Sequence, residues 1–80
     1  MFVSVKYFKT NLGGYHGAEY TYRTELPLVP GDQVIAPTYK EPRTRGLVTA
    51  VGLPEPTYQC RVIEEYDPEG NMVTEGGTTL

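Results

Sequence analysis

The segment of residues 38–45 concentrates the side chains best suited to hold a ligand. Those side chains are Tyr39, Lys40, Arg43 and Arg45, opposed by one acid, Glu41, which leaves a local net charge of +2. Arginine guanidinium groups hold phosphate through paired hydrogen bonds, and an aromatic ring stacks on a base. The segment therefore predicts a nucleic-acid contact, and the alternative is a solvated hairpin loop.

Two further tyrosines offer an aromatic surface of their own. Residues 19–25 read EYTYRTE, and the alternation of a strand places Tyr20, Tyr22 and Thr24 on one face. Tyrosines on a strand face can stack on bases or sugars, as they do in proteins that bind single strands. The alternative is that both rings cap a small core and keep their hydroxyls at its rim.

Catalytic and metal-binding patterns are missing from the chain. Glu64 and Glu65 are adjacent, but neighbouring strand residues point to opposite faces, so the two carboxyl groups cannot work as an acid/base pair. No phosphate-binding GxxxxGK loop is present, and one cysteine with one histidine cannot build a four-ligand metal site. We therefore expect a protein that is not an enzyme and carries no cofactor or metal.

The central part of the chain reads as a turn followed by a hairpin. Pro30 and Gly31 suit the two central positions of a type II turn, from which Asp32 can bind the following backbone amides. Residues 33–36 are too short for a helix between two prolines and predict a strand. Residues 46–51 predict the second strand, so residues 38–45 become the loop that joins the two.

The flanking segments also predict strands. Residues 2–8 alternate, with Val3, Val5 and Tyr7 on one face, and the glycine-rich residues 11–17 should form the loop after them, with Tyr15 and His16 at its tip. Residues 58–66 predict the last strand. Its Cys60 is most simply a small buried hydrophobic residue.

Five short strands separated by Gly/Pro turns indicate an all-β fold. We expect a small five-stranded barrel of SH3-like type over residues 1–68, because an OB-type barrel usually runs longer. Residues 69–80 form an acidic tail, which either adds a short strand or is disordered.

Composition narrows the setting of the protein. The 80 residues include a single cysteine, which fits a reducing cytoplasmic compartment, and no signal peptide or membrane span is expected. The net charge of −3 argues against generic nucleic-acid binding. Residues 1–48 carry a net +2 and residues 49–80 a net −5, so the negative excess lies in the C-terminal part.

Residues 20–66 also resemble a known family, the N-terminal 3′-end DNA-binding domain of the primosomal replication-restart helicase (primosomal protein A). The shared features are an aromatic-x-Tyr strand at residues 20–22, the Gly-x-x-Val turn and strand from Gly31 to Pro37, a basic loop, the Gly-aliphatic-Val strand at residues 46–48, and a Val-Ile-x-x-x-Asp strand at residues 62–67. Short phage and bacterial proteins of unassigned function are similar in length. The family resemblance implies a barrel that recognises a nucleotide at a DNA 3′ end, with Tyr20 lining the pocket. Thr21 stands where the family has an acid.

Two functions follow from these observations. One is a DNA-associated accessory protein that contacts single-stranded or 3′-terminal DNA through Tyr20, Tyr22, Tyr39, Lys40, Arg43 and Arg45. The other is a protein-interaction or structural module of a phage or mobile element, which uses an exposed strand edge or the tyrosine face and binds no nucleic acid. The acidic C-terminal part favours the second function, and the basic loop favours the first.

Overall fold

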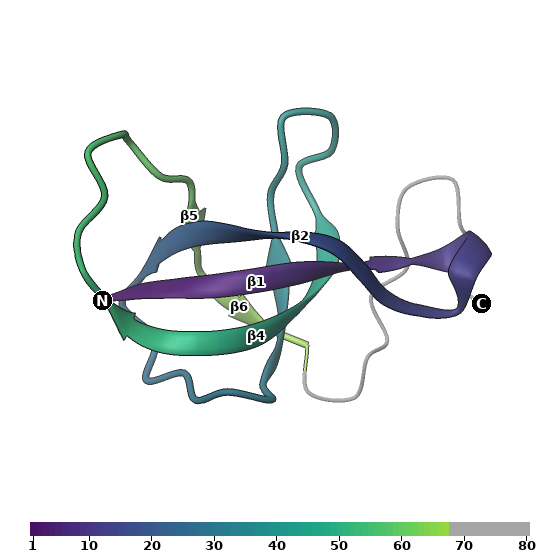
Figure 1. The fold of residues 1–80 in the computed structure, drawn as a ribbon, viewed down its shortest axis with the longest axis horizontal. Helices are drawn as coiled ribbons and strands as arrows, with labels where there is room; N and C mark the ends of the chain where they lie inside the picture. The colour runs from purple at the N-terminus through teal and green to yellow at the C-terminus, as the bar shows by residue number, and fades with distance from the viewer. Residues whose placement is uncertain (68–80) are drawn as a thin grey trace.

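Short stretches of alternating residues become β-strands throughout residues 1–67, the part of the chain that the computed structural model describes (Figure 1). In chain order the elements are β1 (Phe2–Lys9), the 3-10 turn η1 (Thr10–Leu12), β2 (Gly14–Thr24), β3 (Gln33–Ala36), β4 (Thr44–Leu53), β5 (Val62–Ile63) and β6 (Glu65–Tyr66). These described residues contain no α-helix, and the prediction of an all-β fold is confirmed.

The strands of this region form one mixed sheet in the order β5-β2-β1-β4-β3-β6. The pairs β2–β1, β1–β4 and β4–β3 are antiparallel. At the two ends of the sheet, β5 is parallel to β2 and β6 is antiparallel to β3. The ladder is open, because β5 and β6 are its two ends and are not paired with each other. Only Glu64 separates them in the chain, so one short segment reaches both ends of the sheet.

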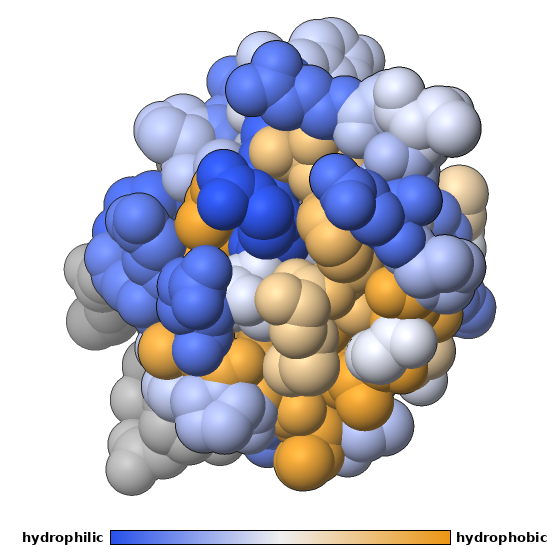
Figure 2. All heavy atoms as spheres, turned by 90° about the vertical axis from the view of Figure 1, so that its left-hand side faces the viewer, coloured by the Kyte–Doolittle hydropathy of each residue, from blue (hydrophilic) through white to orange (hydrophobic). Residues whose placement is uncertain are grey.

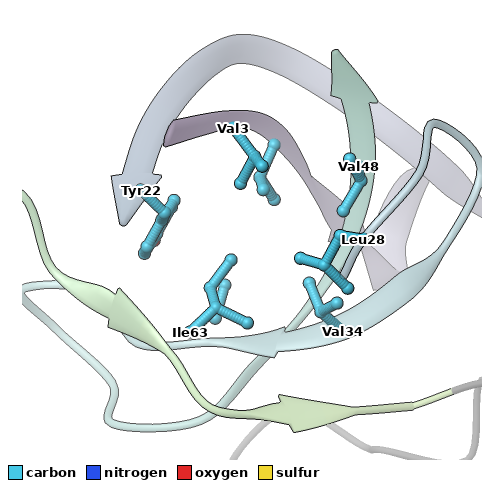
Figure 3. Packing of buried hydrophobic residues seen from close by; sticks show 8 residues of the cluster. Val3, Tyr22, Leu28, Val34, Val48 and Ile63 are labelled. Carbon is cyan, nitrogen blue, oxygen red and sulfur yellow. The ribbon is translucent and has the colours of Figure 1, made fainter. Parts of the chain in front are cut away.

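The sheet curls around a single apolar core (Figure 3). The buried side chains come from every strand except β6 and from the segment between β2 and β3; they are Val3, Val5, Tyr22, Leu28, Val34, Ala36, Val48 and Ile63. Figure 3 shows the labelled members pointing toward one another from different strands. Full burial of such a side chain contributes about 1.5–3 kcal/mol, so this cluster is the main source of stability.

The turn before β3 follows the sequence prediction with one difference. Gly31 has φ +99°, and the Asp32 amide donates to the Val29 carbonyl at 3.1 Å, as a type II turn requires. The Asp32 carboxylate, however, accepts from the preceding Val29 amide at 2.9 Å. The sequence predicts that Asp32 binds the backbone amides that follow it, whereas this contact is with an amide that precedes it.

The central hairpin is confirmed with a longer second strand. Strand β3 has the predicted bounds, whereas β4 begins at Thr44 and ends at Leu53. Arg45 therefore lies in β4, opposite Ile35, and the connecting loop shortens to residues 37–43.

The glycine-rich loop after β1 is shorter than predicted. Gly13 has φ +69° and closes the turn, so β2 starts at Gly14. Tyr15 and His16 are consequently strand residues opposite Phe8 and Tyr7, and the prediction that they form a loop tip is wrong. The third glycine, Gly17, has φ +95° and lies within the irregular part of β2.

The predicted strand over residues 58–66 is also too long. Pairing starts only at Val62, and Glu64 interrupts it, so two strands of two residues replace one and the described sheet has six strands instead of five. Ile63 is the residue buried in the core, while Cys60 is only partly buried. The interpretation of Cys60 as a buried hydrophobic residue is therefore wrong.

The surface at the N-terminal end of β1 is partly apolar. Figure 2 shows the side that carries the N terminus, where hydrophobic residues gather in a patch bordered by hydrophilic ones. Met1, which is 44% exposed, lies at this end. The predicted tail, residues 69–80, and Pro68 lie outside the described residues. Within residues 1–67 no helix is long and apolar enough to cross a membrane.

Candidate functional site

Arg43 forms an ion pair with Glu65. Its two terminal nitrogens donate to both oxygens of the Glu65 carboxylate at 2.9 and 3.1 Å. This paired hydrogen bond raises the pKa of Arg43 and lowers the pKa of Glu65 from their ordinary values. The Arg43 charge is therefore already matched by a carboxylate on β6.

Arg45 is also engaged. Its guanidinium lies over the Phe8 ring, 4.1 Å from the ring centroid, and its Nε is buried. Phe8 in turn meets Tyr15 edge to face, with centroids 5.3 Å apart. Arg45 thus packs on an aromatic pair instead of standing in the loop as predicted.

Tyr39 and Lys40 remain as the contact residues of the 37–43 loop. The Thr38 hydroxyl accepts from the amides of Lys40 and Glu41 at 3.2 and 2.9 Å, which fixes a tight turn. Tyr39 is 79% exposed at this turn, and the Lys40 ammonium lies 5.8 Å from the centroid of its ring. The loop therefore presents one aromatic ring with a cation beside it.

Tyr22 is a core residue with a fully engaged hydroxyl. It is 2% exposed, donates to the Pro37 carbonyl at 2.5 Å and lies 2.5 Å from the Tyr7 hydroxyl. A carbonyl can only accept, so the Tyr22 proton is used there and Tyr7 must donate to Tyr22. Burial raises the pKa of both hydroxyls above the ordinary value for tyrosine. The ring of Tyr22 is not open to a base.

Tyr20, on the same strand, is open to solvent. It is 49% exposed, and its ring stacks on Tyr7 with centroids 5.0 Å apart and an interplanar angle of 14°. The Tyr7 ring is itself held in place, because its hydroxyl is hydrogen-bonded to the Tyr22 hydroxyl. Tyr20 is therefore a supported aromatic platform, which is the geometry that base stacking requires.

A hollow of about 560 Å³, here called the tyrosine cleft, joins these residues at the η1 end of β1. Its lining comes from β1, η1, β2, β4, the 37–43 loop and the segment before β5: Tyr7, Phe8, Lys9, Thr10, Asn11, Tyr20, Thr38, Tyr39, Lys40, Glu41, Thr44 and Arg61. Three cations, Lys9, Lys40 and Arg61, stand against the single acid Glu41. The Glu41 carboxylate accepts from the Thr44 hydroxyl at 3.1 Å.

A smaller hollow of about 200 Å³ adjoins the tyrosine cleft. The two share Tyr7, Tyr20 and Arg61. The residues that line the smaller one alone include one acid and are Glu19, Thr21, Tyr22, Tyr58, Gln59 and Cys60. Tyr58 is 61% exposed. The site thus consists of two connected hollows with Tyr20 between them.

The structure brings together only part of the predicted site. Tyr20, Tyr39 and Lys40 meet in the cleft, whereas Arg43 and Arg45 do not line it. Sequence reasoning missed Lys9 and Arg61, which no local motif marks, since one ends β1 and the other precedes β5. Their contribution depends on the sheet bringing distant segments together.

No group of three His, Cys, Asp or Glu side chains within residues 1–67 is placed to hold a metal ion. A comparison with protein-family models, curated proteins and solved structures finds no match, so the function has to be inferred from the site itself.

Proposed function

We propose that this protein is a non-catalytic small β-barrel module of SH3-like type that binds single-stranded DNA in the tyrosine cleft. The observation that carries the proposal is the Tyr20 ring, half exposed and stacked on Tyr7, in a hollow that contains three cations and one acid. Stacking platforms combined with positive charge are the common means of holding single strands. The resemblance to a 3′-end DNA-binding domain agrees with this proposal.

The barrel part of the proposal is supported by the segment that contains β5 and β6. It pairs with β2 through Val62 and Ile63 and with β3 through Glu65 and Tyr66. The curled sheet and its single core are what a small barrel would have.

The charge distribution favours a short, local contact over generic DNA binding. The protein as a whole carries −3, whereas the cleft has Lys9, Lys40 and Arg61 against Glu41. Each neutralised phosphate of a single strand contributes about −0.7 to the slope of log affinity against log salt. Three cations should therefore give a slope of about −2, which salt titration can measure.

The test is an amide-resolved NMR titration with an oligothymidylate of about eight nucleotides, a length within the range of small-barrel binding sites. We expect shifts in β2 around Tyr20 and in the 37–43 loop. Tyr20→Ala should weaken binding about fivefold or more, since base stacking on an aromatic ring contributes about 1–3 kcal/mol. The matched control is Tyr66→Ala, which removes a tyrosine that is 41% exposed but lies outside the cleft.

Repeating the titration with a 3′-phosphate on the oligonucleotide separates end recognition from binding along the strand. Loss of the shifts on blocking would establish recognition of a free 3′ end. If no amide moves at low salt, the protein does not bind single-stranded DNA and the proposal is wrong.

The free edge of β2 favours a second candidate, a protein-interaction module of a phage or mobile element. Strand β2 pairs with β5 only at Arg23 and Thr24, so residues 14–20 have no strand on that side within the described part of the chain. An extended peptide could add a strand there. A partner that protects the amides of residues 14–20 from hydrogen exchange, without competition from DNA, would favour this function.

A further inference from the structure

The two hollows each have an exposed tyrosine of their own and share a third. Tyr39, 79% exposed, lines the tyrosine cleft, and Tyr58, 61% exposed, lines the smaller hollow. Tyr20 borders both. One face of the Tyr20 ring is covered by Tyr7, so one base can stack on its other face near Tyr39, while a base in the smaller hollow meets Tyr58.

Arg61 is the cation that both hollows share. Its backbone carbonyl accepts from the Arg23 amide at 2.9 Å, which fixes its main chain beside β2. Its positive charge acts on both the Tyr7 and Tyr22 hydroxyls and opposes the effect of burial on their pKa values. Arg61 lines both hollows, so its side chain can contact a ligand that occupies either one.

The hydroxyls of Tyr7 and Tyr22 cannot donate to an anion. Tyr22 donates to Pro37 and Tyr7 donates to Tyr22, so neither proton is left for a ligand. Phosphate oxygens only accept hydrogen bonds at neutral pH. Arg61 is the cation that both hollows share, and its planar group donates several hydrogen bonds at once, which suits it to hold a phosphate there.

Size separates the two hollows. The tyrosine cleft, about 560 Å³, falls within the range of about 300–1,000 Å³ typical of small-molecule sites, and the smaller hollow, about 200 Å³, lies below it. The cleft also has two lysines that the smaller hollow lacks. A ligand that uses both must therefore be longer than one nucleotide, with its larger and more anionic part in the cleft.

We infer that the unit recognised is two consecutive nucleotides that straddle Tyr20, with the phosphodiester between them on Arg61. One base lies in the tyrosine cleft between Tyr20 and Tyr39, and its neighbour lies in the smaller hollow beside Tyr58. This inference rests on the proposed function and gives that site a length and an internal order.

The first experiment compares two ligands of equal charge: the methyl ester of thymidine 5′-monophosphate and the dinucleotide d(TpT). Dissociation constants come from amide shifts of the full chain. We expect d(TpT) to bind about tenfold more tightly, because it adds one stacked base. A d(TpT) with an uncharged methylphosphonate linkage should bind more weakly than the charged d(TpT), because Arg61 then has no anion to hold. Equal affinity of the methyl ester and d(TpT) would overturn the inference.

Variants locate each part of the ligand. Tyr58→Ala should weaken d(TpT) and leave the mononucleotide ester unchanged, whereas Tyr39→Ala should weaken both. Arg61→Ala should abolish the preference for the charged linkage. Arg23→Ala is the matched control, because it removes an exposed arginine that lines neither hollow. If Arg61→Ala keeps the preference, Arg61 does not hold the phosphate.

The failure of this inference is distinguishable from the failure of the proposed function. Tight binding of the longer oligothymidylate with no difference between one and two nucleotides would leave the proposed function standing and overturn the two-nucleotide unit. Absence of binding by every oligonucleotide would overturn both.

Discussion

At the scale of single residues, the hydroxyl of Tyr22 is the most constrained group near the cleft. It accepts a hydrogen bond from Tyr7, and it donates its own proton to the Pro37 carbonyl, which connects β2 to the start of the 37–43 loop. Burial raises its pKa above the ordinary value of 10.0, so the folded protein binds this proton more tightly than the unfolded chain does. Stability that depends on the neutral hydroxyl is complete below about pH 10 and falls as the pH rises further.

The prediction for Tyr22→Phe is a stability difference that depends on pH. At pH 7 the variant should lose about 1–3 kcal/mol, because a buried hydrogen bond disappears and its partners lose their contact. Above about pH 10 the wild type loses the stability that depends on the neutral Tyr22 hydroxyl. The variant has no such hydroxyl, so the difference between the two free energies of unfolding should narrow. Urea unfolding at both pH values measures this. Tyr39→Phe, at an exposed ring, should change nothing, and a gap that is constant with pH would contradict the assignment.

At the scale of elements, the Arg43–Glu65 ion pair connects the 37–43 loop to β6. Both side chains are about half exposed, so the pair is a modest contribution that screening by salt reduces further. Its geometric effect matters more, since it holds the loop against the strand next to β3. The loop can then present Tyr39 and Lys40 on its other side, toward the cleft.

Glu65→Gln should reveal this contact through acid pH. The pKa of Glu65 is lowered by Arg43, so the pair stabilises the fold above the ordinary pKa of 4.5 and ceases to do so as the pH falls through the lowered value. The variant should be less stable than the wild type at pH 7 and equal to it near pH 2. Chemical denaturation at the two pH values provides the measurement, with Glu64→Gln as the neighbouring control. Equal stability at pH 7 would show that the pair contributes nothing.

At the scale of the whole molecule, the fold was more predictable than the site. Alternation of Val3 and Val5, the two prolines around residues 33–36 and the Pro30-Gly31 turn are local signals, and each gave the correct element. The last strands were harder, because two-residue pairings are set by the sheet they join and leave no periodic pattern of their own.

The site was only partly predictable because charge in a sequence does not show where a side chain is used. The sequence gives no partner for Arg43 or Arg45. In the structure Arg43 pairs with Glu65 and Arg45 packs on Phe8, and both contacts join distant segments of the chain. Tyr20, Tyr39 and Lys40 were predicted as nucleic-acid contacts from two separate segments, and the fold places all three in one cleft. Lys9 and Arg61 could be added only once the topology was known.

Ile63→Ala should destabilise the whole molecule. Ile63 is 1% exposed, lies in β5 and belongs to the core, so its truncation leaves a cavity that costs about 2–5 kcal/mol. Thermal and urea unfolding should show one cooperative transition at lower temperature and lower denaturant. Val62→Ala, at a partly buried neighbour, should cost less. A second transition in Ile63→Ala would mean that β5 and β6 unfold apart from the rest.

The segment that contains β5 and β6 also sets the order in which the fold can be completed during synthesis. Strands β1 to β4 leave the ribosome first and can form their hairpins, but β2 and β3 keep unpaired edges and the core lacks Ile63 until residues 62–66 follow. Open edges attract other chains. Until this last described segment emerges, the nascent protein therefore exposes the edge of β3 and residues 23–24 of β2 to misassociation, in addition to residues 14–20, whose edge stays open in the finished sheet.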